Sequence, residues 1–146
     1  MLQKGDKAPN FSLVDHHGNI VTLEDILKQK KVVLYFYPKN FTAGCTKESC
    51  AFRDDYELFL ERGAEVIGIS HDTEKSHNQF ASKYKLPFIL LSDNKNVVRK
   101  LFGVPKILGL LTMRATFVID KDNTILKTFS APWHYVEHIA EALQVL

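Results

Sequence analysis

The chain has 146 residues, enough for one domain with a sizeable core. Hydrophobic residues make up 45% and charged residues 25%, which is typical of a globular protein and excludes a disordered chain. The net charge is only +2 and no basic block occurs, so neither nucleic acid nor a membrane surface is expected as a partner. Residues 1–10 lack the apolar stretch of a signal peptide. We expect a single domain over residues 1–146 and a cytoplasmic location.

Apolar runs typical of strands alternate with segments that carry apolar residues at helical spacing. In chain order we expect two short strands in residues 10–23 around a turn at 15–19, a helical turn at 24–29, a strand at 31–38, a helix at 46–62, a strand at 64–70, a helix at 75–85, a strand at 88–93, a helix at 96–103, a hairpin of strands 114–120 and 124–130, and a terminal helix at 134–146. This order predicts an α/β fold in which helices flank a mixed central sheet, and it suits a thioredoxin-like fold.

The strand at residues 31–38, KVVLYFYP, is nearly all apolar, as expected of a central strand buried on both faces. We assign its aromatic residues Tyr35, Phe36 and Tyr37 to the core. Trp133 is assigned to the core as well, and His71 to a loop without a role.

Both cysteines of the chain, Cys45 and Cys50, lie in the segment FTAGCTKESC, and three interpretations of them are open. They could be small buried hydrophobic side chains, which is the commonest fate of free cysteine. They could belong to a metal site completed by His134 and His138, which would share a face of the terminal helix, although zinc sites usually have closer cysteine pairs. They could also form a redox pair.

The position of Cys45 favours the redox pair. It follows a strand, Pro38 and two small residues at the point where the next helix begins. Its sulfur would there meet free backbone N–H groups and the positive end of the helix dipole, and both favour a thiolate. Cα atoms five residues apart on a helix are separated by about 8–9 Å, more than the roughly 7 Å that a disulfide spans. Cys45 and Cys50 can therefore bond only if the first turns of the helix unwind.

The segment PKNFTAGC, residues 38–45, matches the P-x3-T-x2-C signature, and the chain resembles the peroxiredoxins, which are thiol peroxidases with a thioredoxin fold. The second cysteine, LPFILLSD at residues 86–93 and FGVPKILGLLTMRATFVIDKDN at residues 102–123 are similar to the bacterioferritin-comigratory, or Q, subfamily. The resemblance covers essentially the whole chain. Met113, before Arg114, stands where this subfamily more often has a small residue.

The resemblance implies a reaction for the two cysteines. Cys45 would attack a peroxide oxygen and become a sulfenic acid, and Cys50 would condense with it to give an intramolecular disulfide. Thioredoxin or a glutaredoxin-type dithiol protein would regenerate the thiols. The substrates would be hydrogen peroxide and organic hydroperoxides, with no cofactor and no metal, and the protein would be a monomer or a weak dimer.

The resemblance also implies supporting residues. Pro38 would wall the pocket, and Thr42 would hydrogen-bond the peroxide and the thiolate. Arg114 would stabilise the thiolate and the charge that develops on the leaving oxygen, together with the backbone N–H of Cys45. Glu48 would order Arg114 through an ion pair. Taken singly, Pro38, Thr42 and Arg114 are better explained as a strand terminator, a capping residue and a surface charge. Their joint occurrence with Cys45 favours a site.

Two other functions compete with this one. A thioredoxin-like protein disulfide oxidoreductase would use a C-x-x-C pair that closes without unwinding, and the chain lacks that spacing. A copper or zinc chaperone on the same fold would need a ligating histidine near the end of the sheet. In that protein Arg114 would place an unfavourable positive charge beside the metal.

Overall fold

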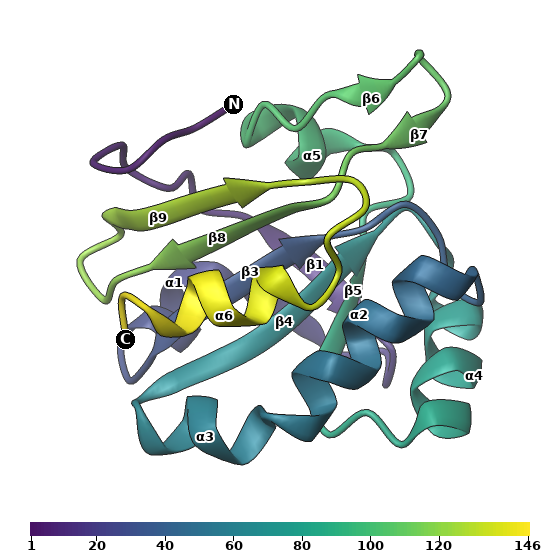
Figure 1. The fold of residues 1–146 in the computed structure, drawn as a ribbon, viewed down its shortest axis with the longest axis horizontal. Coiled ribbons are helices and arrows are strands. Elements are labelled where there is room, and N and C mark those ends of the chain that lie inside the picture. The colour runs from purple at the N-terminus through teal and green to yellow at the C-terminus, as the bar shows by residue number, and fades with distance from the viewer.

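The computed structural model describes all residues 1–146 and is built on a seven-stranded sheet (Figure 1). The strands are β1 (Ser12–Asp15), β2 (Ile20–Thr22), β3 (Lys31–Phe36), β4 (Ala64–Ser70), β5 (Ile89–Ser92), β8 (Ala115–Ile119) and β9 (Ile125–Ser130). Their order across the sheet is β2-β1-β5-β4-β3-β8-β9. Strands β3, β4 and β5 run parallel, whereas β1, β8 and β9 pair antiparallel with their neighbours. The predicted mixed central sheet is confirmed.

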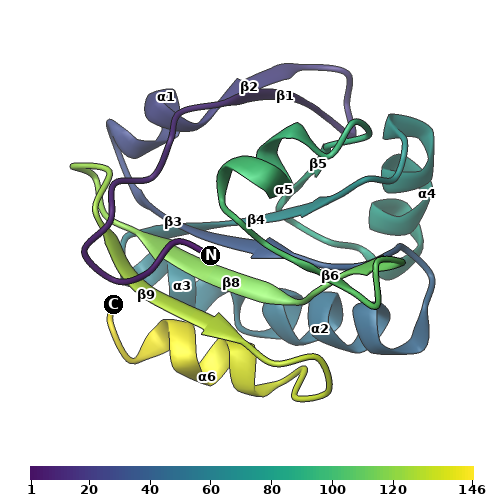
Figure 2. The same ribbon diagram turned by 90° about the horizontal axis from the view of Figure 1, so that it is seen from above.

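Helices cover both faces of this sheet. They are α1 (Leu23–Leu27), α2 (Ala43–Asp54), α3 (Tyr56–Glu61), α4 (Glu74–Tyr84), α5 (Val97–Leu101) and α6 (Glu137–Leu143). Figure 2 shows α2, α3 and α6 below the sheet and α1 and α5 above it. None of the helices has the length and apolar character that crossing a bilayer requires.

Strand β3 supplies side chains to two separate cores, because successive residues of a strand point to opposite faces. Val32, Leu34 and Phe36 join the core under α1 and α5. Val33 and Tyr35, together with Tyr37 directly after the strand, join the core under α2, α3, α4 and α6. The prediction that this strand is central and buried on both faces is confirmed, as is the burial of its three aromatic residues.

The predicted helix at residues 46–62 is two helices. Helix α2 begins at Ala43, three residues before the predicted start, because Thr42 keeps extended backbone angles (φ −77°, ψ 152°) and acts as its N-cap. The run is interrupted at Asp55, whose angles (φ −103°, ψ 9°) leave the helical range and end α2 before α3 starts. The terminal helix is also shorter than predicted, since α6 starts at Glu137.

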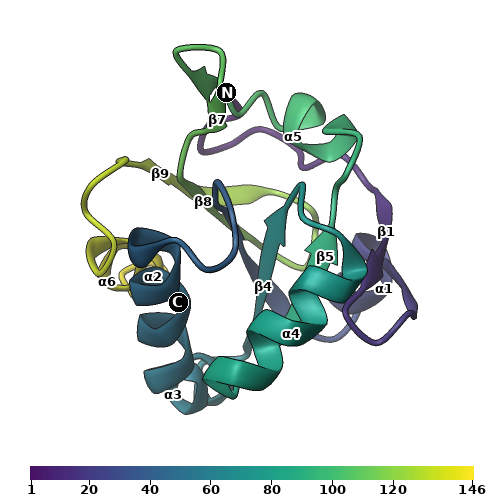
Figure 3. The ribbon, with the colours of Figure 1, turned by 90° about the vertical axis from the view of Figure 1, so that its right-hand side faces the viewer.

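Residues 104–113, between the expected helix at 96–103 and the expected strand at 114–120, contain a small hairpin, β6 (Lys106–Ile107) and β7 (Leu111–Thr112). Its tip turns through Leu108 and Gly109, both with positive φ (51° and 72°). Figure 3 shows that this hairpin projects from the body of the molecule. A strand pair of two residues each leaves little periodicity in a sequence, so the pattern of residues 104–113 did not predict this hairpin.

Candidate active site

The first turn of α2 carries Cys45. The first hydrogen bond of this helix runs from the Thr46 N–H to the Thr42 carbonyl at 2.9 Å. The N–H groups before Thr46 have no acceptor within the helix, because every helix leaves its first four donors free. Cys45 is the third residue of α2 and is fully buried at this positively polarised end. The backbone of this first turn therefore stabilises negative charge on the Cys45 sulfur, before any side chain is considered.

Arg114 reaches Cys45 from a distant part of the chain. Phe36 at the end of β3 pairs with Ala115 in β8, and this register brings the preceding residue, Arg114, beside the segment that leads into α2. Arg114 is only 6% exposed, and its Nη2 donates to Cys45 Sγ at 3.2 Å. Its Nε donates to the Pro132 carbonyl at 3.2 Å, which fixes the plane of the guanidinium. A cation is thus held against a buried thiol.

Glu48, about one helical turn after Cys45, contacts the other end of the same guanidinium. Arg114 Nη1 lies 3.1 Å from Glu48 Oε1, and the carboxyl group is fully buried. Burial raises the pKa of Glu48 to about 8, against the opposing effect of the Arg114 charge. The Arg114 guanidinium thus lies between the Glu48 carboxyl group and the Cys45 sulfur and donates to both.

His138, in α6, packs behind Glu48. Its Nε2 donates to the Ala131 carbonyl at 3.0 Å, and its Nδ1 accepts from the Thr116 hydroxyl at 2.8 Å. Burial lowers the pKa of His138 to about 4, so the ring is neutral at pH 7 and its 3.7 Å approach to Glu48 is not an ion pair. The expectation that His134 and His138 share a helix face is wrong, because His134 precedes α6 and is exposed.

A pocket of about 220 Å³ opens at the first turn of α2. It is lined by the loop before α2, the β6–β7 hairpin and the loop before α6, with the residues Pro38, Thr42, Gly44, Ile107, Leu111, Arg114, Pro132, Trp133 and Tyr135. The wall is mostly apolar, with polar groups at Thr42 and Arg114. Cys45 does not line this pocket, but Arg114 contacts both the pocket and the sulfur. Three predicted site residues, Pro38, Thr42 and Arg114, therefore meet at one cleft.

The hydroxyl of Thr42 is already committed as a donor. It donates to the Lys39 carbonyl at 2.9 Å, and it makes no bond to Cys45 Sγ in this structure. Its oxygen still has lone pairs that accept a hydrogen bond from a ligand in the pocket. Pro38, which follows β3, is buried and forms part of the same wall.

Cys50 lies five residues beyond Cys45 on the same intact helix, and both thiols are free. Two contacts hold this part of α2 on the sheet: Ser49 Oγ lies 2.9 Å from the Tyr35 hydroxyl, and the Phe52 ring stacks on Tyr35 at 4.5 Å. Cα atoms five residues apart on a helix are separated by about 8–9 Å. A disulfide tolerates only about 7 Å. The segment before Phe52 must therefore leave its helical conformation before the two sulfurs can bond.

The loop before α6 is a part of the site that the sequence did not predict. It supplies Pro132, Trp133 and Tyr135 to the pocket. The assignment of Trp133 to the core is wrong, since its side chain is 75% exposed at the pocket rim. A proline and aromatic residues without helical or strand periodicity do mark a loop after β9. Nothing local to that loop, however, indicates that it contacts Arg114.

A buried polar network that fixes the loop before α2 was not predicted either. The Tyr37 hydroxyl donates to Asn40 Oδ1 at 2.6 Å, and the Asn40 N–H donates to Asp72 Oδ2 at 2.9 Å. The Asn40 side-chain amide also donates to His77 Nδ1 at 2.9 Å. Burial lowers the pKa of His77 to about 4, so the ring is neutral at pH 7 and can accept this bond. From the sequence alone, Asn40 after Pro38 indicates only a turn and does not predict these buried hydrogen bonds.

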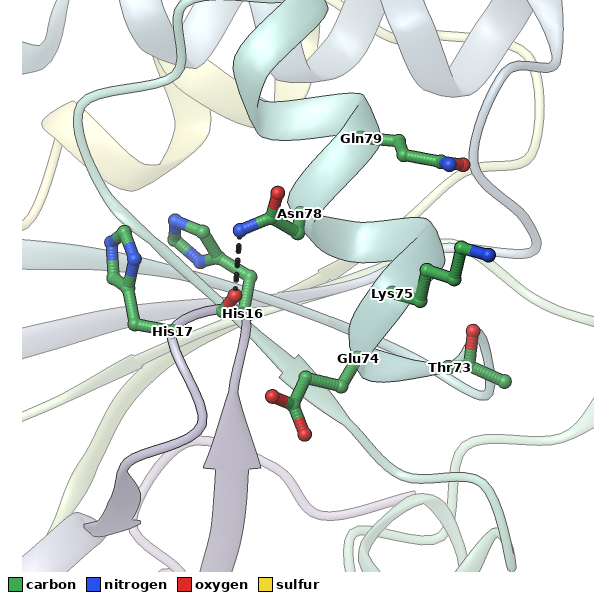
Figure 4. Close-up of a pocket in the computed structure, with 7 residues that line it drawn as sticks. All are labelled: His16, His17, Thr73, Glu74, Lys75, Asn78 and Gln79. Atoms are coloured by element: carbon green, nitrogen blue, oxygen red, sulfur yellow. Dashed lines mark hydrogen bonds between the residues drawn. The ribbon is translucent and has the colours of Figure 1, made fainter.

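The largest pocket of the structure, about 750 Å³, shares no residue with this cleft (Figure 4). It lies between the turn after β1 and the start of α4 and is lined by His16, His17, Thr73, Glu74, Lys75, Asn78 and Gln79. His16 Nδ1 accepts the Leu90 N–H at 3.2 Å, and Asn78 Nδ2 donates to the His16 carbonyl at 3.0 Å. These residues join the turn to β5 and α4, and we place no chemistry there.

Residues 4–128 match the AhpC/TSA family. The whole chain is 51% identical over 146 residues to peroxiredoxin Q, a chloroplastic protein of Arabidopsis thaliana, and the match covers 99% of this chain and 67% of that protein. The chain is a peroxiredoxin of the AhpC/TSA family.

This peroxiredoxin is also similar to solved structures. The crystal structure of peroxidoxin BcpB from Mycobacterium tuberculosis superposes with a TM-score of 0.93 at 38% identity, covering 99% of this chain and 96% of that one. The bacterioferritin comigratory protein of Xanthomonas campestris, studied for its alkyl peroxide reduction activity, gives a TM-score of 0.82 at 28% identity, covering 92% and 90% of the two chains. The expected thioredoxin-like fold of a Q-type peroxiredoxin is confirmed.

Proposed function

We propose that the protein is a thiol peroxidase that reduces hydrogen peroxide and organic hydroperoxides, with Cys45 as its nucleophile. The observation that carries this proposal is the 3.2 Å contact of Arg114 Nη2 with Cys45 Sγ at the first turn of α2. The Cys45 thiolate attacks one peroxide oxygen, and an S–O bond forms as the O–O bond breaks. The leaving oxygen takes a proton and departs as water or an alcohol, and Cys45 becomes a sulfenic acid.

The residues around Cys45 have different roles in the attack on the peroxide. Arg114 stabilises the thiolate before the attack and the charge on the breaking O–O bond during it, because a fixed cation needs no reorganisation as that charge develops. The free N–H of Cys45 contributes to the same cradle. Thr42, whose own proton is bound to the Lys39 carbonyl, accepts the hydrogen bond of the peroxide O–H. Pro38 limits the access of water.

The pocket supports organic hydroperoxides as substrates alongside hydrogen peroxide. Beyond Thr42 and Arg114 its wall is mostly apolar, with Ile107, Leu111 and Trp133 facing the space that an alkyl group would take. The Xanthomonas campestris relative is described by its alkyl peroxide reduction activity. We infer the same substrate class here.

Cys50 acts as the resolving cysteine. Its sulfur attacks the Cys45 sulfenic acid, an S–S bond forms, and the hydroxyl leaves as water. A dithiol protein such as thioredoxin or a glutaredoxin-type reductant then supplies the two electrons that return both cysteines to thiols. The free thiols on an intact α2 correspond to the reduced enzyme at the start of this cycle.

Three further expectations remain predictions. Residues 1–146 are proposed to act as one domain. A monomer or a weak dimer is expected, and light scattering over a range of protein concentrations tests it. A cytoplasmic location stays a prediction, because the Arabidopsis relative is chloroplastic, and imaging of the tagged protein in its host decides it.

Stopped-flow measurement of peroxide consumption, with thioredoxin and its reductase as the electron source, tests the proposed cycle. Cys45→Ser should lower turnover to below a few per cent of wild type while leaving the fold intact, because the change is nearly isosteric. Cys50→Ser should keep a fast first oxidation of Cys45 and lose sustained turnover. Normal turnover of the Cys45→Ser protein would exclude Cys45 as the nucleophile. Reduction of insulin disulfides without any peroxide reaction would instead indicate a protein disulfide oxidoreductase.

A further inference from the structure

The ring of Tyr135 packs against the guanidinium of Arg114. The Arg114 Cζ atom lies 4.6 Å from the centroid of the Tyr135 ring, and both residues line the pocket. The face of an aromatic ring carries negative electrostatic potential and attracts a guanidinium. Arg114 is therefore held from three directions: by Glu48 and Pro132 through hydrogen bonds and by Tyr135 through its ring.

Gly44 shows how tightly these groups pack. A Cβ atom at residue 44 would lie 2.6 Å from Tyr135 Cζ and 2.7 Å from Arg114 Nη2, distances that real Cβ atoms essentially never show. Gly44 lies inside α2 and does not have a positive φ, so its backbone conformation does not require glycine. The glycine is needed because the ring and the guanidinium occupy the space where a side chain would be. Because Cys45 directly follows Gly44, this close packing lies next to the sulfur.

We infer that Tyr135 is a positioning residue for the peroxidase reaction, because its ring presses the Arg114 guanidinium against Gly44 and thereby aims Nη2 at the sulfur of Cys45. This inference rests on the proposed function. The ring acts in two ways. It restricts the rotation of a long side chain, and it keeps water of the pocket away from the cation, which preserves the strength of its electrostatic interaction with the thiolate.

Two substitutions of Tyr135 distinguish the contribution of its aromatic ring to the reaction rate from that of its hydroxyl group. Tyr135→Leu keeps apolar volume but removes the aromatic face, and it should slow the oxidation of Cys45 by hydrogen peroxide by about tenfold, the effect expected of a partly desolvated cation–π contact. Tyr135→Phe keeps the face and should restore most of that rate. Val136→Ala, at an exposed neighbour outside the pocket lining, is the matched control and should react like wild type.

A double-mutant cycle distinguishes positioning from a general structural effect. If Tyr135 acts through Arg114, Tyr135→Leu should slow the reaction little further when Arg114→Met is already present, because the group that it orients is gone. A loss of the same size in both backgrounds would overturn the inference. Thermal unfolding of each variant accompanies the cycle, so that an unfolded protein is not counted as a slow one.

The choice of peroxide gives a second readout. A residue that orients Arg114 should slow hydrogen peroxide and tert-butyl hydroperoxide by similar factors, since both need the same cation. A loss confined to the bulky hydroperoxide would overturn the inference and leave Tyr135 as a pocket wall only. A wild-type protein that fails to react with any peroxide would refute the proposed function itself. A reactive wild type with an unchanged Tyr135→Leu rate would refute only the role of Tyr135.

Discussion

Asn40 and His77 form a buried hydrogen bond of 2.9 Å across 37 residues of sequence. Asn40 lies in the loop between β3 and α2, two residues after Pro38 and two before Thr42, whereas His77 lies in α4. The bond therefore connects the loop that forms one wall of the pocket to a helix that takes no part in the chemistry. Because His77 accepts this bond only while its Nδ1 is unprotonated, the connection depends on pH.

We predict that acid destabilises the protein through His77. Its pKa is about 4 in the folded protein and 6.5 in the unfolded chain, because burial disfavours the charged ring. Between pH 6.5 and pH 4 the unfolded state therefore binds a proton that the folded state does not. The free energy of unfolding falls as the pH falls through that window.

His77→Asn keeps an acceptor near the position of Nδ1 and removes the titration. Urea unfolding at pH 7, 6 and 5 should show a smaller loss of stability in this variant than in wild type, even if its stability at pH 7 is lower. His134→Asn, at an exposed histidine, is the control and should keep the wild-type slope. Identical slopes for wild type and His77→Asn would show that His77 does not titrate as its burial implies.

Arg114→Met should slow the reaction of Cys45 with hydrogen peroxide by about a hundredfold or more, as loss of a preorganised charge-stabilising donor does in other enzymes. Stopped-flow kinetics under single-turnover conditions measure this rate directly. Arg62→Met, at an exposed arginine whose guanidinium donates to the Leu143 carbonyl, is the control for loss of one positive charge. An unchanged rate constant for Arg114→Met would make Arg114 a bystander.

Oxidation by one equivalent of hydrogen peroxide should unwind the start of α2. Amide exchange in residues 43–50 should accelerate, and intact mass should show the loss of two hydrogens that marks an intramolecular disulfide. Trp133, the only tryptophan, lines the same pocket as Gly44, so its fluorescence should change with the redox state. Cys50→Ser should instead gain oxygen without accelerated exchange, and excess peroxide should carry it to sulfinic acid. Unchanged protection in the oxidised wild type would refute the unwinding step.

Glu48 should make the protein less stable as the pH rises from 4.5 to 8. The folded carboxyl group has a pKa of about 8 and keeps a proton that the unfolded chain, with a value of 4.5, has already released. Because the folded state binds more protons in this window, the free energy of unfolding decreases with increasing pH. Above about pH 7.5 the buried histidines are neutral in both states and no longer contribute, so the range from about pH 7.5 to 8.5 reports on Glu48 without them.

Glu48→Gln should flatten the stability profile over that range, since the amide can still accept from Arg114 but does not titrate. Glu57→Gln, at an exposed position on α3, is the matched control and should keep the wild-type profile. If Glu48→Gln and wild type lose stability in parallel, the carboxyl group is already ionised in the folded protein.

The sheet was predictable because its strands carry strong local signals. KVVLYFYP and AEVIGIS are continuous apolar runs, and each became a central parallel strand. The boundaries of α2 were less predictable. Ala43 favours a helix but Gly44 disfavours one, so residues 43–45 do not mark the start, and the helix starts at Ala43 because Thr42 is held extended. The end of α2 at Asp55 was also not predicted, because no glycine or proline lies there.

The candidate site divides in the same way. Pro38, Thr42 and Cys45 lie within one short motif, so their proximity follows from the sequence. Contacts between Arg114 and residues such as Tyr135 depend on how loops from β3, β8 and β9 converge, and no local pattern encodes that convergence. The same holds for Trp133: an aromatic residue usually indicates a core, but here the loop that carries it lies outside both cores.

Phe52 sets a limit on how far α2 can unwind. Its ring is fully buried, stacked on Tyr35 at 4.5 Å and 5.8 Å from Phe59, so unwinding beyond it would open the core. The proposed unwinding is therefore confined to about two turns, which are held by polar contacts such as Ser49 with Tyr35 and Glu48 with Arg114. In the proposed cycle, the strength of these contacts sets the lifetime of the Cys45 sulfenic acid before Cys50 reaches it. During that time a second peroxide can oxidise it further. The amount of peroxide that the protein tolerates in this cycle therefore depends on the stability of the first two turns of α2, and it can change without any change in the reacting groups.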